Sequence, residues 1–158
     1  MAARDILFTG AILFILASSF FVLKFTSTTI TDKLTMSPLN ESAQAVSALR
    51  ASDAAVSKSD YLFFGAFIAL FLGLIITGWF IGGVPIFMFI YFLFIVVATL
   101  VGAFLSNFWE TTTTASIFGT TILSFPITNH IMLYLPFYLA VFGTAGLIVM
   151  FAKPREAL

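Results

Sequence analysis

Residues 61–109 read YLFFGAFIALFLGLIITGWFIGGVPIFMFIYFLFIVVATLVGAFLSNFW, a run of 49 residues without a charged side chain. One helix of that length would be about 73 Å long, more than twice the ~30 Å hydrocarbon thickness of a bilayer. The run must therefore fold back on itself. Gly82-Gly83-Val84-Pro85 marks the turn, because glycine tolerates positive φ and proline suits the first turn of a new helix. We expect an antiparallel pair of spans over 61–81 and 85–106.

The composition of the whole chain requires an apolar environment. Of the 158 residues, 61% are apolar and 9% are charged, whereas an ordinary soluble domain carries charge on about a quarter of its positions. Seven basic and seven acidic side chains are too few to cover a soluble globule. The net charge of zero argues against a nucleic-acid partner, and the absence of cysteine excludes disulfides, zinc-thiolate sites and iron-sulfur clusters.

The N-terminal apolar stretch, 6–25, predicts another span. Lys24 lies near its end, where a long side chain can extend to the headgroups. A cleaved signal peptide is the alternative interpretation, but Asp5 dilutes the positive charge expected there and the apolar stretch is long for a signal.

The last apolar stretch, 131–152, predicts a fourth span. Lys153 and Arg155 follow it, and two cations suit both the negative end of a helix and the headgroups. We therefore expect an all-α integral membrane protein with both termini on the same side of the membrane. Its four transmembrane helices would occupy about 6–25, 61–81, 85–106 and 131–152.

The first connection, 26–60, is polar and contains a predicted short helix. Ser37 can cap this helix and Pro38 fits its first position. Apolar residues then recur at helical spacing at Leu39, Ala43, Val46 and Leu49. The helix could lie on the membrane, cover the bundle or dock on a neighbouring protein. We favour docking, because its alanine-rich face is poor in the large side chains that bind lipid.

The second connection, 107–130, predicts an irregular, Thr-rich loop. Trp109 and Glu110 mark a membrane boundary, since aromatic residues gather at headgroup level and a carboxylate avoids hydrocarbon there. Four threonines follow at 111–114, and Gly119 and Pro126 interrupt the remainder. We expect an interfacial or partly re-entrant loop in which threonine hydroxyls satisfy backbone groups.

Small residues form stripes at four-residue spacing on the second and third spans. Such stripes allow close helix approach, either at an oligomer interface or, as we favour, within the hairpin of these two spans. The stripes comprise Gly65, Ala69, Gly73, Thr77, Ala98, Gly102 and Ser106. Phenylalanines lie opposite them and predict a coat facing lipid or another subunit, as at Phe63, Phe67, Phe71, Phe87 and Phe94.

Reactive groups are scarce. His130 is the sole histidine, so one chain cannot build a multi-histidine metal or haem site, and we expect no cofactor. The imidazole is expected to be a polar helix-start residue at the interface. None of the four predicted spans carries an acid or an arginine in its interior, which disfavours an ion-coupled transporter.

Two segments flanking the second connection resemble parts of small membrane proteins from tailless icosahedral phages with an internal membrane. They are Leu105-Ser106-Asn107-Phe108-Trp109-Glu110 and Phe125-Pro126-Ile127-Thr128-Asn129-His130. The resemblance covers about 12 residues and implies a protein embedded in the vesicle beneath a capsid. It assigns no functional residue.

These patterns predict a non-enzymatic structural protein that packs into a larger membrane assembly. Its partners would be lipid and copies of itself or other membrane or capsid proteins, in a cell membrane or a viral internal membrane. The two connections, 26–60 and 107–130, would face those partners. An oligomeric, holin-like pore and an accessory subunit of a membrane enzyme complex remain as alternatives.

Overall fold

The computed structural model describes residues 2–36, 42–81, 85–118 and 120–152, and these contain helices but no strand. The order is α1 (Ala2–Thr35), α2 (Ala43–Ser57), α3 (Ser59–Ile81), α4 (Pro85–Thr113), the 3-10 helices η2 (Ser116–Phe118) and η3 (Ile122–Ser124), α5 (Pro126–Leu133) and α6 (Leu135–Ala152). Four candidate spans are long and apolar enough to cross a membrane, with α2 and α3 contributing to one of them. The predicted all-helical, four-span class is confirmed in these terms.

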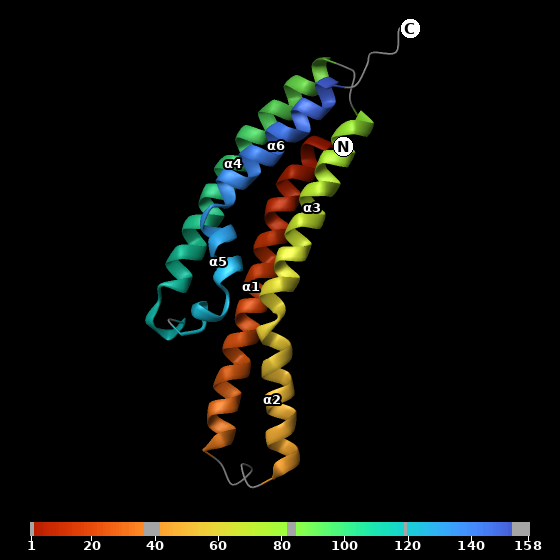
Figure 1. The fold of residues 1–158 in the computed structure, drawn as a ribbon. Helices are drawn as coiled ribbons and strands as arrows, with labels where there is room; N and C mark the ends of the chain where they lie inside the picture. The colour runs from red at the N-terminus through yellow and green to blue at the C-terminus, as the bar shows by residue number, and fades with distance from the viewer. Residues whose placement is uncertain (1, 37–41, 82–84, 119, 153–158) are drawn as a thin grey trace.

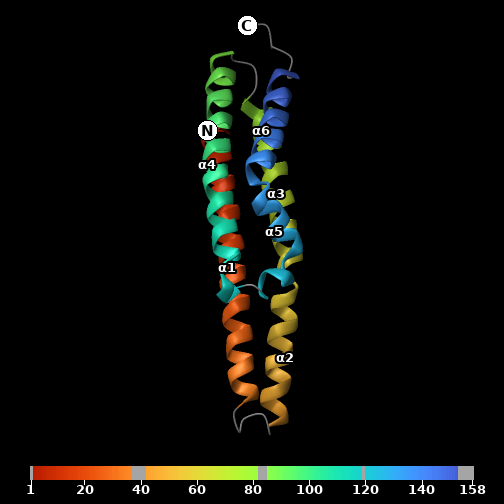
Figure 2. The same ribbon diagram turned by 90° about the vertical axis from the view of Figure 1, so that its left-hand side faces the viewer.

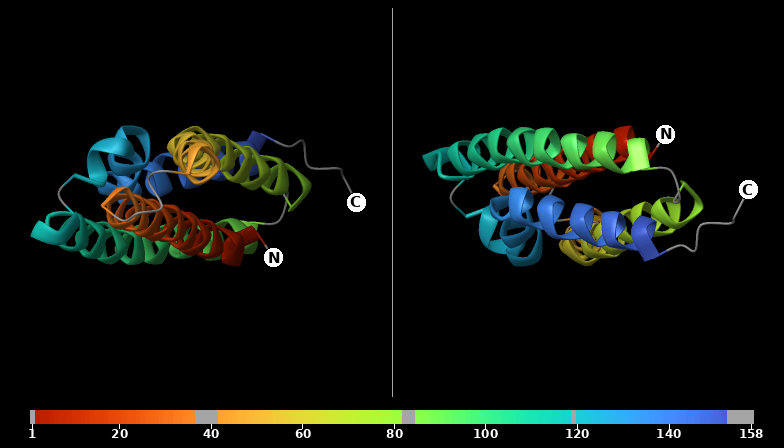
Figure 3. Two further views of the ribbon diagram at one scale, coloured as in Figure 1. Left: turned by 90° about the horizontal axis from the view of Figure 1, so that it is seen from below. Right: turned by 90° about the horizontal axis from the view of Figure 1, so that it is seen from above.

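The four long helices, α1, α3, α4 and α6, form a bundle in which α3 and α4 lie diagonally opposite each other (Figures 1 and 3). Each of these two helices packs on both α1 and α6, which lie between them. The expectation that the second and third spans pack on each other is therefore wrong. The predicted turn at 82–84 lies outside the described residues. The start of α1 and the end of α6 lie at the same end of the bundle (Figure 1).

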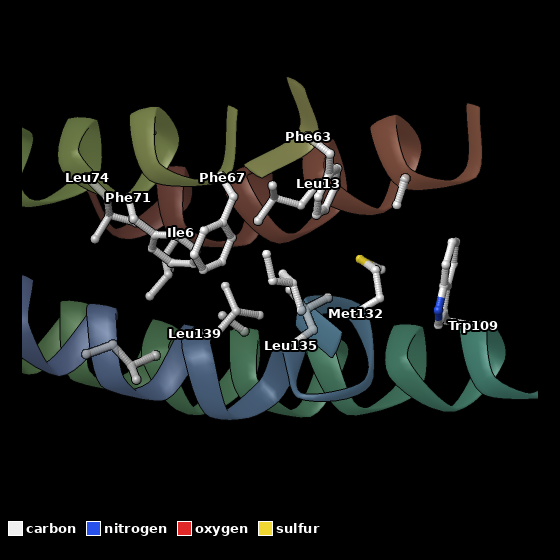
Figure 4. Packing of buried hydrophobic residues seen from close by; sticks show 14 of the residues in the cluster. Ile6, Leu13, Phe63, Phe67, Phe71, Leu74, Trp109, Met132, Leu135 and Leu139 are labelled. Atoms are coloured by element: carbon white, nitrogen blue, oxygen red, sulfur yellow. The ribbon is translucent and has the colours of Figure 1, made fainter. Parts of the chain in front are cut away.

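The core contains Phe63, Phe67 and Phe71 of α3, contrary to the predicted outward coat (Figure 4). Phe63, Phe67 and Phe71 are at most 4% exposed, and the Phe71 ring stacks on that of Phe142 at 4.2 Å between centroids. Aromatic rings fill the space between helices that glycine would leave empty. The prediction holds better on α4, where Phe87 is half exposed.

A two-helix stalk, formed by residues 25–35 of α1 and by α2, extends beyond the bundle (Figure 2). On α2 the residues turned inward recur at alternating three- and four-residue spacing, as in a coiled coil. They are Val46, Leu49, Asp53 and Val56. The chain makes a tight turn at Lys58, where the Tyr61 N–H donates to the Lys58 carbonyl, and then continues as α3.

The stalk revises the expectation for the first connection. Residues 26–35 continue α1 instead of forming a loop, and Thr28 and Thr29 donate their hydroxyl protons to carbonyls three or four residues earlier. The α2 helix docks on α1 of the same chain. Packing between the two helices offsets the weak helix preference of threonine. The helix start predicted at Ser37 and Pro38 lies outside the described residues.

Threonines 111–113 form the end of α4 and Thr114 follows it, so the predicted loop 107–130 is mostly helical. Each hydroxyl donates to the carbonyl four residues earlier, at 2.7–2.9 Å. This agrees with the expectation that threonines satisfy backbone groups, but it does so inside a helix. The two 3-10 turns then return the chain to α5, near the junction of α2 and α3 (Figure 1).

The predicted last span is divided at Tyr134 into α5 and α6. Pro136 has no N–H to donate to the preceding turn, which explains the break. The Ser106 hydroxyl on α4 donates to the carbonyl of Leu133, the last residue of α5, at 2.6 Å. Gly102 lies one turn away, where an added Cβ would be 2.7 Å from Leu139 Cδ1 and 3.3 Å from Pro136 Cα. The small residues of α4 thus pack against α6 and its junction with α5.

The Gly146→Ala substitution should destabilise the bundle by about 2 kcal/mol, because an added Cβ would lie 2.5 Å from the buried Tyr91 hydroxyl oxygen. Thermal unfolding in detergent measures the change. Gly65→Ala is the matched control, since nothing lies within 4 Å of a Cβ there. Adding Tyr91→Phe removes the clashing oxygen and should restore part of the stability of Gly146→Ala. Additive effects in the double variant would contradict the proposed contact.

Candidate functional site

Asp60 connects the start of α3 to the start of α5 across 67 residues of chain. Its carboxylate is buried and accepts hydrogen bonds from the Ile127 N–H at 3.1 Å and the Thr128 N–H at 2.7 Å. The Thr128 hydroxyl also donates to it at 2.7 Å. Phe125, which precedes α5, supplies no side-chain cap. Asp60 therefore caps α5 from another helix, and its negative charge faces the positive end of the helix dipole.

Lys24 is bound by the stalk and does not extend freely toward lipid. It is 6% exposed, and its ammonium forms an ion pair with the Asp53 carboxylate of α2. This departs from the predicted snorkelling orientation, because a carboxylate on a packed helix lies within reach of the amine. The pair sits in the seam between α1 and α2 where the stalk joins the bundle.

Trp109 is also turned inward, instead of forming part of an aromatic belt against lipid. It is 2% exposed, its indole N–H donates to Asn129 Oδ1 at 3.0 Å, and its ring meets that of Phe21 edge-on at 5.5 Å between centroids. The following residue, Glu110, is exposed. Lys153 and Arg155, the other predicted interface residues, lie outside the described residues.

We call these three connections the polar clasp, because they tie α1, α2, α3, α4 and α5 together at one end of the bundle. Its members are Lys24, Asp53, Asp60, Thr128, Trp109 and Asn129. Sequence reasoning missed Asp53, Asp60, Thr128 and Asn129. A signal for Asp60 was present: Pro126 begins a helix after a phenylalanine that cannot cap it, so an acceptor from elsewhere was required.

The predicted small-residue stripes separate into an inner and an outer set. Ala98, Gly102 and Ser106 are buried on α4. On α3, by contrast, Gly65, Ala69 and Gly73 are exposed and Thr77 is partly exposed. We call these four residues the α3 outer face.

The α3 outer face has room for a neighbour. A Cβ placed on Gly65 or Gly73 would meet nothing within 4 Å. Gly73 also lines a groove of about 320 Å³ between α1 and α3, together with Ala69 and Thr77 and with Asp5 and Thr9 of α1. The stripe is therefore open at Gly65 and Gly73 in the single chain.

Chemistry at His130 is not supported by nearby metal-binding groups. No cluster of three metal-binding side chains occurs among the described residues. His130 lies in the last turn of α5, not at a helix start as predicted, and its ring centroid is 4.8 Å from that of Tyr134. In comparisons with known proteins, no family model matches the chain, and no curated protein or solved structure matches it either.

Replacing Asp60 by leucine should lower the free energy of unfolding by about 2 kcal/mol, because two backbone N–H groups of α5 lose their acceptor. Hydrogen–deuterium exchange should accelerate at Ile127 and Thr128. Asp60→Asn keeps one acceptor oxygen and should lower the free energy of unfolding by less. Glu110→Gln, at an exposed carboxylate, should change neither the free energy of unfolding nor the exchange at these two residues. Unchanged exchange at 127 and 128 in Asp60→Leu would show that the cap is dispensable.

The two members of the Lys24–Asp53 pair should respond unequally to substitution. Asp53→Ala leaves a charged lysine buried without its partner and should cost about 3 kcal/mol. Lys24→Met leaves a carboxylate that is 48% exposed and can be hydrated, so the loss should be about 1 kcal/mol or less. Chemical unfolding measures both values. The double variant should be more stable than Asp53→Ala alone, and the reverse order would contradict the ion pair.

Proposed function

We propose that this protein is a non-enzymatic structural membrane protein that packs laterally into a larger assembly through the α3 outer face. The observation that carries the proposal is the open space at Gly65 and Gly73, in contrast to the tight surroundings of Gly102 and Gly146. Lipid provides no hydrophobic drive for helix association, so association depends on close backbone approach and shape fit. A stripe of small residues left open within the chain suits a helix from a neighbouring subunit.

The proposed membrane position follows from the polar ends of the spans. The distance along the helix from Asp5 to Lys24 is about 29 Å and that from Asp60 to Ile81 is about 32 Å, at 1.5 Å per residue. Both match the ~30 Å hydrocarbon thickness. The polar clasp would then lie at one boundary, the stalk would project into water, and both termini would lie on the opposite side.

The partner on the α3 outer face would be a second copy or another membrane protein. The phage resemblance extends the proposal to the internal membrane of a virion, where capsid proteins would meet the projecting stalk. Finding the protein in purified particles, and not in the host membrane alone, would support this location. A pore would instead produce solute flux in liposomes.

Gly73→Leu should abolish or weaken assembly, because the leucine fills the space that a neighbouring helix would occupy. Crosslinking in the native membrane, followed by sizing in mild detergent, measures the assembly. Ala103→Leu on the exposed side of α4 is the matched control and should assemble like the wild type.

The two variants should unfold at similar temperatures, since neither position is packed within the chain. A wild-type protein that runs as a lone monomer and crosslinks to nothing would overturn the proposal. Equal assembly by wild type and Gly73→Leu would exclude the α3 outer face as the interface.

A further inference from the structure

A second groove lies on a different side of α3, where α3 meets α5 and α6. It has a volume of about 530 Å³ and opens to the outside of the bundle. Apolar side chains supply most of its wall: Phe64 and Phe67 from α3, Ile127 and Ile131 from α5. Pro126, His130 and Tyr138 complete it. We call this the α5 groove.

Two side chains that line the α5 groove carry a polar group, Tyr138 with its hydroxyl and His130 with its imidazole, and the imidazole lies nearer the start of α5. The side chain is exposed and forms no hydrogen bond to another described residue, although its ring contacts those of Tyr134 and Tyr138. His130 lies one helical turn from Pro126, on the bundle side of the Asp60 cap. In the proposed membrane position it is therefore just inside the boundary, where an unpaired imidazole needs a hydrogen-bonding partner.

The negative charge of Asp60 beside the groove favours an uncharged ligand group over an anionic one. The positive end of α5 is already neutralised by the buried Asp60 carboxylate, which binds the N–H of Ile127. A phosphate or carboxylate would meet this negative charge, whereas an uncharged oxygen acceptor would not.

The arrangement of polar and apolar groups along the groove matches an amphiphile. His130 lies toward the boundary, while Phe67 and Tyr138, whose ring centroids are 5.2 Å apart, continue the wall toward the bundle centre. A ligand would place its polar part near the headgroups and its apolar part along these rings.

We propose that the α5 groove binds one acyl chain of a bilayer phospholipid, with the ester carbonyl of that chain accepting a hydrogen bond from His130. The chain fills the apolar groove, and the neutral carbonyl satisfies the imidazole without approaching Asp60 as a charge. This lipid site uses another side of α3 than the proposed assembly surface, so the two can be tested independently.

The test is a titration of delipidated full-length protein in detergent with dioleoylphosphatidylcholine, followed by native mass spectrometry. At low lipid concentration, the wild type should bind one lipid molecule per chain. His130→Phe keeps an aromatic ring but loses the hydrogen bond, so the lipid concentration for half-occupancy should rise about fivefold. Ile127→Trp should block binding by filling the groove.

Tyr134→Phe is the matched control, because it removes an exposed hydroxyl beside His130 from a residue that does not line the groove. It should bind like the wild type, and all variants should keep the wild-type unfolding temperature without lipid. Should Ile127→Trp fail to fold, His130→Phe still decides. Equal lipid affinity of wild type and His130→Phe would overturn the proposal, as would native-membrane crosslinks from the groove to another protein.

Discussion

The carboxylate of Asp60 at the start of α5 is the interaction on which the arrangement of this bundle depends. A charged group is costly to bury unless hydrogen bonds replace its water, and here two backbone N–H groups and one hydroxyl do so. In return, α5 gains the cap that Phe125 cannot provide. The contact holds α5 against α3, and thereby fixes where the chain returns from α4 and where α6 enters the bundle.

The Lys24–Asp53 pair sets the alignment of the stalk in a similar way. The inward positions of α2 follow coiled-coil spacing, and an apolar seam alone tolerates sliding by a heptad. A buried lysine that finds its carboxylate in only one alignment penalises such sliding. Because α2 continues into α3 after a single tight turn at Lys58, the alignment of the stalk also fixes the height of α3, and with it the position of Asp60.

The sequence predicted the four candidate spans because charges are scarce in their apolar parts, but it did not predict the rotation of α3. That helix is apolar on every side, so helical periodicity carries no information about which face is buried. Whether Phe67 or Gly73 faces inward depends on the volume that the side chains of α1 and α6 leave next to α3. The Asp60 cap was predictable only in part. Pro126 after Phe125 indicates that α5 needs an acceptor from elsewhere, but no local pattern identifies Asp60, which precedes Ile127 by 67 positions and Thr128 by 68. The sequence also placed the ends of α1 and α4 too early. Threonine has a weak helix propensity, which did not indicate that the Thr35 and Thr113 hydroxyls would donate to carbonyls of the preceding helical turn.

The different use of small residues on α3 and α4 follows from the same packing problem. On α4 the small residues face α6. Gly102 lies against the backbone of Pro136, and Ser106 donates to the Leu133 carbonyl at the end of α5. On α3 large rings fill the core, so Gly65, Ala69 and Gly73 face outward, whereas Gly78 packs on Gly146 of α6. In water such a surface would be unremarkable, but in a bilayer shape fit and close approach decide helix association. The same rotation that fills the core with phenylalanine therefore leaves the backbone at Gly65 and Gly73 open on the outside of the bundle.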